Sequence, residues 1–225
     1  VKITVLCKIL RKGSAFMSDN ETRQKLIDSA KKEFFENGFA KASLRKICTN
    51  AGVTTGALYF FFRNKDDLFS AIVAPPLLKL KEMLIKHNRE DEEYLGSQDE
   101  QTRSVENQLS THKEAVTMVG CLYDNYDAFL LLLTKSQGSV YENCVDEFVA
   151  LMEVGFRSSA EALLKNMPGY HVDEYMLHWL AHMDIEMFIH LLTHVPEKEK
   201  GLAYAEKMIG AMVKMWFDLL FVKDE

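Results

Sequence analysis

Apolar residues recur along this chain at the three- and four-residue steps of α-helices. The clearest stripe lies in residues 21–37 and ends at Asn37-Gly38, a pair that commonly stops a helix; its members are Leu26, Ile27, Ala30, Phe34 and Phe35. No segment alternates apolar and polar residues convincingly with the period of two that is typical of a strand. The pattern therefore predicts an all-α protein.

Three more helices are predicted directly after this first one. Ser43 caps a short helix that Gly52 ends. Thr54 opens a third helix, which runs to about Phe61, and Asn64 caps a fourth. The first four helices are thus expected to be joined by tight turns.

The rest of the chain continues the helical pattern. Pro75-Pro76 falls inside the fourth helix, which we expect to kink or restart there and to continue to about residue 90. A weak point is expected at Gly120, and the further helices are predicted over residues 103–134, 140–166, 172–194 and 198–222. This gives about nine helices in all.

The composition excludes several other classes of protein. With 11 Gly and 4 Pro in 225 residues, the chain is poor in the turns of an all-β fold. No apolar run approaches the roughly 20 residues that cross a bilayer. The four cysteines include no Cys-x-x-Cys pair, which is typical of a reduced, cytoplasmic protein. Residues 1–16 are expected to be a poorly ordered upstream extension, because Met17 followed by SDNETRQ is typical of a natural start.

The charged residues are divided unevenly along the chain. The formal net charge is −6, yet residues 21–65 hold nine Lys and Arg against four Asp and Glu, a net of +5. Residues 66–225 hold 14 basic against 28 acidic side chains. A small basic module joined to a larger acidic one is typical of a protein whose first part binds a polyanion, with chance clustering of surface charge as the alternative.

The second and third predicted helices form a helix-turn-helix, which can place its last helix in the major groove of DNA. Small residues at 54–57 let that helix approach base edges closely, and a threonine hydroxyl or methyl group can contact a base. Ser43, Tyr59 and Lys65 are placed where phosphates would lie. An ordinary helical hairpin with a glycine turn is the alternative.

Residues 43–68, SLRKICTNAGVTTGALYFFFRNKDDL, resemble the signature of the TetR family of bacterial transcriptional regulators (tetracycline-repressor-like). The matching positions are Ser43, Ile47, Ala51, Gly52, Val53, Thr54, Gly56, Leu58, Tyr59, Phe62, Lys65, Asp66, Asp67 and Leu68. The resemblance implies that three residues hold phosphates, namely Ser43, Tyr59 and Lys65. It implies that Thr54, Thr55 and Ala57 face bases and that Arg45 reaches in from the preceding helix; Gly56 completes the expected DNA-binding residues.

Two positions depart from the family pattern. Cys48 replaces the usual alanine, which exchanges one small residue for another. Phe61 stands where a His or Tyr commonly contacts a phosphate. That contact is therefore expected to be missing and the DNA-binding face to be slightly apolar.

The resemblance also implies the domain organisation, with a DNA-binding domain over residues 17–65 and a larger helical domain over residues 66–225. The larger domain is expected to bind a small molecule and to dimerise through its last two helices. Apolar residues recur on these helices as in a helix-packing seam, although burial within one chain uses the same pattern. The residues expected in the dimer interface are Met183, Met187, Leu202, Ile209, Met212 and Trp216.

The central helices hold the candidate ligand-binding residues. Thioether and aromatic side chains suit an apolar or aromatic ligand, although most such residues at helical spacing are simply core. The candidates are Met118, Tyr123, Tyr126, Phe129, Tyr141, Met152 and Phe156.

A row of histidines supplies a rival function. His178, His182, Glu186, His190 and His194 repeat every four residues, and a His pair at this spacing can chelate zinc, with Glu186 as a third ligand. Each such step turns about 40° around a helix, so at most three neighbours could share a metal. An all-α metalloenzyme is the resulting alternative. Without a HExxH motif, a Ser/His/Asp arrangement or a phosphate-binding Gly loop, however, no catalytic or metal site is predicted.

The sequence therefore predicts a homodimeric, cytoplasmic transcriptional repressor that needs no cofactor and has no membrane partner. It is expected to bind a palindromic operator in double-stranded DNA and to be released by a small-molecule inducer. A DNA-binding protein of the same fold without an inducer is the second interpretation. Residues 66–90 are expected to carry the ligand response, with a hinge at Pro75-Pro76.

Overall fold

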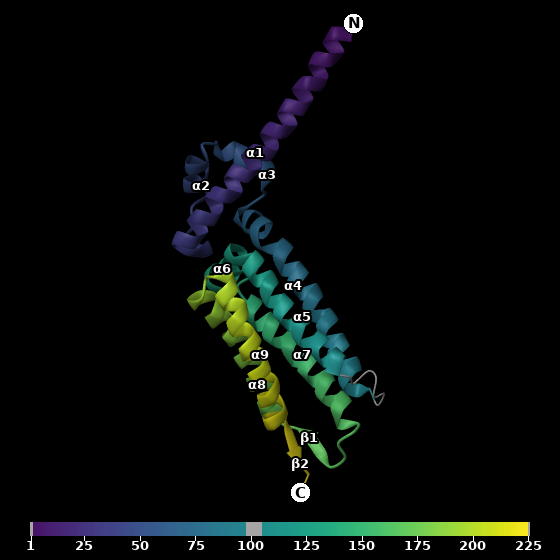
Figure 1. Ribbon diagram of the computed structural model, residues 1–225. Coiled ribbons are helices and arrows are strands. Elements are labelled where there is room, and N and C mark those ends of the chain that lie inside the picture. The colour runs from purple at the N-terminus through teal and green to yellow at the C-terminus, as the bar shows by residue number, and fades with distance from the viewer. Residues whose placement is uncertain (1, 98–104, 225) are drawn as a thin grey trace. The chain divides into compact units, whose positions relative to one another are not determined.

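A computed structural model describes the backbone of residues 2–97 and 105–224 and the side chains of residues 19–97 and 113–224 (Figure 1). Within these residues the chain has nine α-helices and one two-stranded sheet, so the predicted all-α class is confirmed. The chain divides into two compact units. The first is Val1–Pro75 with Thr134–Glu142, and the second is Pro76–Leu133 with Asn143–Glu225.

The first unit contains α1 (Lys2–Lys41), α2 (Leu44–Ala51), α3 (Thr55–Phe61) and the start of α4 (Lys65–Gly96). The helical backbone of α1 is interrupted at Gly38, whose φ of 70° a residue with a side chain rarely adopts. The predicted stop at this glycine is therefore confirmed. Residues 2–16 belong to the first part of α1, and their treatment as a separate extension stays a prediction.

The core of the first unit is built from the predicted stripe of α1. Leu26, Ala30 and Phe34 are fully buried, whereas Phe35 is only half-buried. The ring of Phe34 meets Phe69 of α4 edge to face, with ring centroids 5.0 Å apart. These buried side chains give the first unit a hydrophobic core of its own. Each fully buried Leu or Phe side chain stabilises the folded state by roughly 1.5–3 kcal/mol.

A segment that is distant in the sequence completes the first unit. Residues 134–142 follow α6 (Tyr126–Lys135), and the backbone N–H of Val140 donates to Oδ1 of Asp66 over 3.0 Å. The hydroxyl of Tyr141 lies 3.1 Å from that of Ser70, also on α4. The first unit thus runs beyond residue 65, and it takes in residues that the sequence assigned to the second domain.

Helix α4 is continuous through Pro75-Pro76, so the restart expected there does not occur. Proline has no N–H, so these two residues leave the carbonyls of Ala71 and Ile72 without their usual helical donors. The division between the two units falls between the same two prolines.

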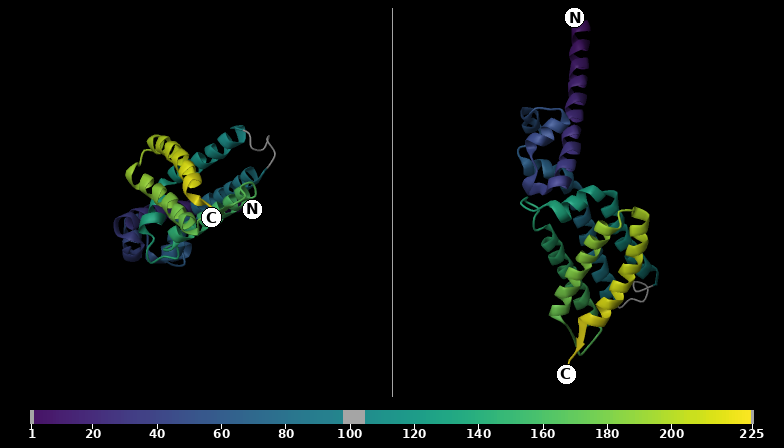
Figure 2. Two further views of the ribbon diagram at one scale, coloured as in Figure 1. Left: turned by 90° about the horizontal axis from the view of Figure 1, so that it is seen from below. Right: turned by 90° about the vertical axis from the view of Figure 1, so that its left-hand side faces the viewer.

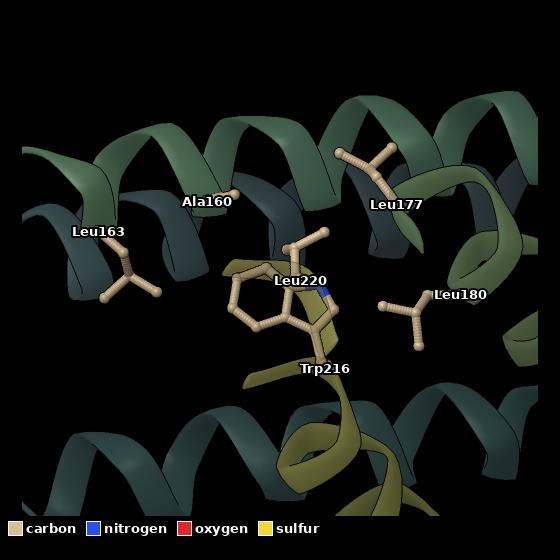
Figure 3. Packing of buried hydrophobic residues seen from close by; sticks show 6 residues of the cluster. All are labelled: Ala160, Leu163, Leu177, Leu180, Trp216 and Leu220. Atoms are coloured by element: carbon tan, nitrogen blue, oxygen red, sulfur yellow. The ribbon is translucent and has the colours of Figure 1, made fainter. Parts of the chain in front are cut away.

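The second unit contains the rest of α4 with α5 (Val105–Asp124), most of α6, α7 (Cys144–Leu164), α8 (Glu174–His194) and α9 (Lys198–Leu220). Helix α8 packs against both α7 and α9, and α5 packs against α9 (Figure 2). In the core of this unit, the indole of Trp216 lies among side chains of α7, α8 and α9, as Figure 3 shows: Ala160, Leu163, Leu177, Leu180 and Leu220.

The break in the predicted helix 103–134 lies at Asn125 and not at the expected weak point, Gly120. The side chain of Asn125 donates to the carbonyl of Cys121 over 3.0 Å, while its own carbonyl accepts from Phe129. Asn125 therefore closes α5 and opens α6, and the two helices are bent by 85°. No single helix in the described residues is long and apolar enough to cross a membrane; this bent pair meets that criterion only when its two helices are taken together.

One short sheet was not predicted. Strands β1 (Tyr170–Val172) and β2 (Phe221–Lys223) pair antiparallel, with Tyr170 opposite Lys223. The N–H of Asp173 donates to Leu220 over 2.8 Å and extends the pairing. Three residues are too few to show a period of two, which is why the sequence pattern missed these strands.

Candidate nucleic-acid interface and cavity

The turn between α2 and α3 depends on a single glycine. Gly52 has a φ of 69°, in the left-handed region, and its N–H reaches the carbonyls of Cys48 and Thr49. The N–H of Val53 then donates to Cys48 over 3.0 Å, which closes the end of α2 in the manner of a glycine C-cap. The predicted helix-turn-helix is therefore present.

Helix α3 presents small residues to the outside of the first unit. The Thr54 hydroxyl caps the helix by accepting from the N–H of Ala57 over 3.2 Å. Thr55 and Gly56 are exposed, Ala57 is half-buried, and Leu58 holds the opposite side of the helix in the core. Thr54, Thr55 and Ala57, which are predicted to face bases, therefore lie together at the start of α3, whereas Arg45 lies on α2.

Nothing in the described part of the chain requires a glycine at position 56. Its φ is not positive, and an added Cβ would meet only the hydroxyl of Thr54 at 3.7 Å, an ordinary contact. By contrast, an added Cβ at Gly155 would lie 2.3 Å from Nδ2 of Asn88, so that side chain would have to move. The missing side chain of Gly56 therefore serves no packing purpose in the described structure.

Ser43 is fixed by a side chain that the sequence analysis missed. Oε1 of Glu33 accepts from the N–H of Ser43 over 3.1 Å, and Oε2 lies 2.8 Å from the ammonium of Lys46. Burial disfavours the charge on Glu33, but the hydrogen bonds from Lys46 and Ser43 hold the pKa of its carboxyl below the usual value. Glu33 lies within the apolar stripe of α1, three residues after Ala30, and this position is the signal that could have identified it.

The predicted phosphate-binding side chains differ in how free they are. The hydroxyl of Ser43 accepts from the N–H of Lys46 over 3.3 Å, which leaves its own hydrogen free to donate. Arg45 is exposed and makes no ion pair among the described residues. Lys65 instead donates to the carbonyls of Ala40 and Ala42 over 3.1 and 3.3 Å, so its ammonium also holds the end of α1 to α4.

The aromatic run at the end of α3 gives the same face an apolar edge. Tyr59 is 57% exposed and Phe60 is 73% exposed, the latter with its ring against Phe61 at 4.9 Å. Phe61 is half-buried and packs against its neighbours. Sequence reasoning did not single out Phe60, whose exposure depends on the packing of Leu58 and Phe62 into the core.

The second unit encloses a cavity of about 790 Å³ among α4, α5, α6, α7, α8 and α9. Four of the seven predicted ligand-binding residues line it, namely Met118, Phe129, Met152 and Phe156. Most of the other lining side chains are aliphatic or aromatic, among them Leu84, Leu122, Ile185, Phe188 and Trp216. This cavity is large enough and apolar enough to hold a small organic molecule.

The other three predicted ligand-binding residues, all tyrosines, have structural partners instead. The hydroxyl of Tyr123 donates to the carbonyl of Val195 over 2.8 Å, and that of Tyr126 donates to Leu192 over 2.7 Å. These bonds satisfy carbonyls at the C-terminal end of α8, which have no helical donors of their own. Tyr141 belongs to the first unit, where it contacts Ser70. None of the three lines the cavity.

Two carboxylates face the cavity. Asp184 projects from the buried face of α8, and burial raises the pKa of its carboxyl to about 7. Asp91 lies on α4, where burial raises its pKa and the nearby His87, with Nε2 3.5 Å from Oδ2, opposes that shift. No Lys or Arg lines the cavity in the described part of the chain.

The residues expected in a dimer interface are directed largely into the chain itself. Ile209 and Trp216 are buried and line the cavity, Met212 lines it as well, and Met183 packs against the core cluster around Trp216. Met187 and Leu202 are half-buried. The seam pattern on α9 is therefore explained mainly by burial within one chain, the alternative that the pattern itself left open.

The histidine row lies mostly on the exposed side of α8. Nδ1 of His178 pairs with the carboxylate of Glu153, and the rings of His190 and His194 stack with centroids 4.0 Å apart. Among the described residues, no three His, Cys, Asp or Glu side chains are arranged to hold a metal ion. The row therefore gives no geometric support to the metalloenzyme alternative.

Comparison with known proteins agrees with the helix-turn-helix. Residues 26–72 match the family model described as bacterial regulatory proteins, tetR family. The chain is 48% identical to the HTH-type transcriptional regulator AcrR of Shigella flexneri over 52 residues. This matched segment makes up 23% of this chain and 24% of AcrR. Over 71 residues it is 35% identical to the HTH-type transcriptional repressor BepR of Brucella suis, or 32% and 34% of the two chains. The matches thus span only a quarter to a third of these relatives.

The likeness in fold extends over most of the chain. The solved structure of NalD, the secondary repressor of the MexAB-OprM multidrug efflux pump in Pseudomonas aeruginosa, aligns with a TM-score of 0.52. This alignment covers 90% of this chain and 98% of NalD at 20% identity, so it establishes the fold alone. Residues 26–72 of this chain are therefore similar to the helix-turn-helix region of the tetR family of bacterial regulatory proteins, and most of the chain shares the fold of NalD.

Proposed function

We propose that this protein is a transcriptional repressor that binds a two-fold symmetric operator as a homodimer and is released by a small molecule held in the cavity. One observation carries the DNA-binding part. Helix α3 exposes Thr55 and Gly56 at its first turn, and no packing contact among the described residues gives a reason for a glycine there. A helix without side-chain bulk on this turn can approach the edges of base pairs closely.

The surroundings of α3 suit a phosphate backbone. Ser43 has a hydroxyl hydrogen free to donate, Tyr59 is exposed, and Arg45 has a guanidinium without an ion pair among the described residues. Such contacts fix the register of a protein on a duplex, while the residues on α3 select the sequence. The net charge of +5 over residues 21–65 supports the same role.

The cavity supports a ligand response. Protein interiors are normally packed without large voids, so about 790 Å³ of space among six helices is a candidate binding site. Residues 134–142 belong to the first unit although the helices on either side of them lie in the second. The chain therefore crosses between the units here as well as within α4, and both connections can carry a change in the cavity to α3.

Dimerisation is proposed through the exposed sides of α8 and α9. Tyr175, Trp179 and Tyr204 are 68%, 39% and 51% exposed there, and aromatic residues are favoured at protein–protein interfaces. A dimer is needed because two recognition helices must reach half-sites about one turn of DNA apart.

Selection of bound duplexes from a random library tests this function with the full-length protein. We expect enrichment of one sequence with two-fold symmetry, bound at roughly 10⁻⁸–10⁻¹¹ M. If repeated rounds enrich no sequence over the starting library, the proposal is wrong.

A further inference from the structure

The cavity of the second unit contains an acidic side chain that has no positively charged partner in the described chain. Asp184 faces it from α8, with Leu180 and Phe188 one helical turn to either side, and both of these also line the cavity. The side chain is buried, yet no hydrogen bond or ion pair reaches its carboxylate among the described residues. A carboxylate in this position loses its hydration without gaining a partner, so a bound molecule is the expected source of one.

Of the other ionisable side chains that line the cavity in the described chain, only His87 can carry a positive charge, and its ring nitrogens pair with the carboxylates of Asp91 and Glu114. His87, Asp91 and Tyr94 face it from α4, and Oε2 of Glu114 on α5 lies 3.8 Å from Nδ1 of His87. The described lining residues of α6, α7 and α9 include no ionisable side chain. A ligand with a carboxylate or phosphate would therefore meet two carboxylates and no Lys or Arg, which disfavours an anion.

Aromatic rings complete the environment. Trp216 lines the cavity, with Phe156 6.2 Å away and Phe217 5.0 Å away, both edge to face. The faces of such rings attract cations, most strongly where water is excluded. The buried Nε1 of Trp216 also has no hydrogen-bond partner in the described structure.

We propose that the cavity binds an organic cation with an apolar body, for which Asp184 is the counter-ion and the aromatic side chains form the walls. This inference rests on the proposed function only in taking the cavity as the ligand site. Binding is measured on the full-length protein without DNA, so it can succeed or fail independently of operator binding.

The test compares tetraphenylphosphonium with tetraphenylborate, two ions of nearly the same shape and opposite charge. Isothermal titration calorimetry at pH 8 is expected to show at least tenfold tighter binding of the phosphonium. The D184N variant should lose at least tenfold in phosphonium affinity and lose nothing toward the borate. D218N is the matched control, because Asp218 is an exposed acid of α9 that does not line the cavity.

The phosphonium charge does not titrate, so any pH dependence of its binding belongs to the protein. Affinity should fall as the pH is lowered from 8 to 5, because protonated Asp184 no longer attracts a cation. This fall in affinity should be much smaller in D184N, where Asp91 and His87 of α4 are the titratable groups that remain beside the ligand. The D91N variant should keep most of the fall, because it still has Asp184.

Three results would overturn the proposal: failure of both ions to bind, borate binding as tight as phosphonium binding, or unchanged phosphonium affinity in D184N. Should D184N fail to fold by circular dichroism, D184L gives the same comparison with an apolar side chain. A protein that selects an operator but binds neither ion would refute this inference alone. One that binds the phosphonium but selects no operator would refute only the proposed repressor.

Discussion

The backbone N–H of Ser43 donates a hydrogen bond to the buried carboxylate of Glu33 over 3.1 Å, so an acid of α1 holds the residue that caps α2. The same carboxylate pairs with Lys46 one turn into α2. Glu33, whose side chain is 2% exposed, therefore helps to fix the helix-turn-helix on α1.

Replacement of Glu33 by alanine is expected to lower the free energy of unfolding by about 1.5–3 kcal/mol, the usual contribution of a hydrogen bond to a charged group. The loss should be largest near neutral pH. The folded-state pKa of Glu33 is lowered, so its contribution is present above about pH 4.5 and disappears as the pH falls through the folded value. Urea unfolding at pH 7 and pH 3 measures this, with E36A as control, because Glu36 is an exposed partner of the same Lys46. Equal losses for E33A and E36A at pH 7 would contradict the role of Glu33.

Asp184 should reduce the stability of the protein when no ligand is bound. Its folded-state pKa of about 7 lies above the ordinary 3.8, so the folded protein binds more protons than the unfolded chain between these values. The stability contributed by this group is therefore greatest below about pH 4 and falls as the pH rises toward 7, by about 4 kcal/mol. D184N should match the native protein near pH 4 and exceed it in thermal stability at pH 8. Parallel pH profiles for the two proteins would show that the carboxylate is not buried.

The dimer prediction changes with the structure. Trp216 was expected in the interface but is buried within the second unit, so W216A should destabilise the protein by about 3–5 kcal/mol. W179E instead places a charge on an exposed residue of α8 and should yield a folded monomer with weak operator binding. Sedimentation velocity and circular dichroism check both variants. A W179E protein that stays dimeric would place the interface elsewhere.

The two prolines of α4 offer a test of how the units communicate. Because α4 is already helical through Pro75-Pro76, alanines there can restore the missing N–H donors to Ala71 and Ile72 without a change of backbone. The double alanine variant should be more stable and should alter the ligand concentration that releases operator, with little change in ligand affinity. The measurement is operator release under titration with a ligand found to bind the cavity. Superimposable release curves would mean that the prolines do not affect the coupling.

The parts of the fold that the sequence predicted are those with local signals. Ser43, Gly52, Thr54 and Asn64 each act through a hydrogen bond or backbone angle within three or four residues of their own position. The helix ends they produce agree with prediction to within a residue or two. Ser43, Gly52 and Thr54 also belong to the family signature, which is why the sequence pattern pointed to α3.

Long-range partners could not be read from the same patterns. Tyr123 and Tyr126 have the composition of a ligand pocket, but their hydroxyls reach carbonyls 72 and 66 residues away. The seam on α9 has the spacing of an interface, yet Trp216 is buried within its own chain. Asp184 gave no signal, because one acid in an apolar helix is usually solvated, and only the cavity shows that this one is not.

Gly56 gives the most direct test of the claim that α3 reads DNA. G56A should fold with unchanged or slightly higher thermal stability, since alanine favours a helix by up to about 1 kcal/mol and its Cβ meets no close neighbour. G120A is the matched control, a helical glycine of α5 with nothing within 4 Å of an added Cβ. Fluorescence anisotropy with the selected operator and a scrambled duplex then measures specific and non-specific affinity. If α3 reads DNA, G56A alone should lose at least tenfold in operator affinity, with non-specific affinity unchanged. Operator affinity in G56A equal to that of G120A and the native protein would contradict it.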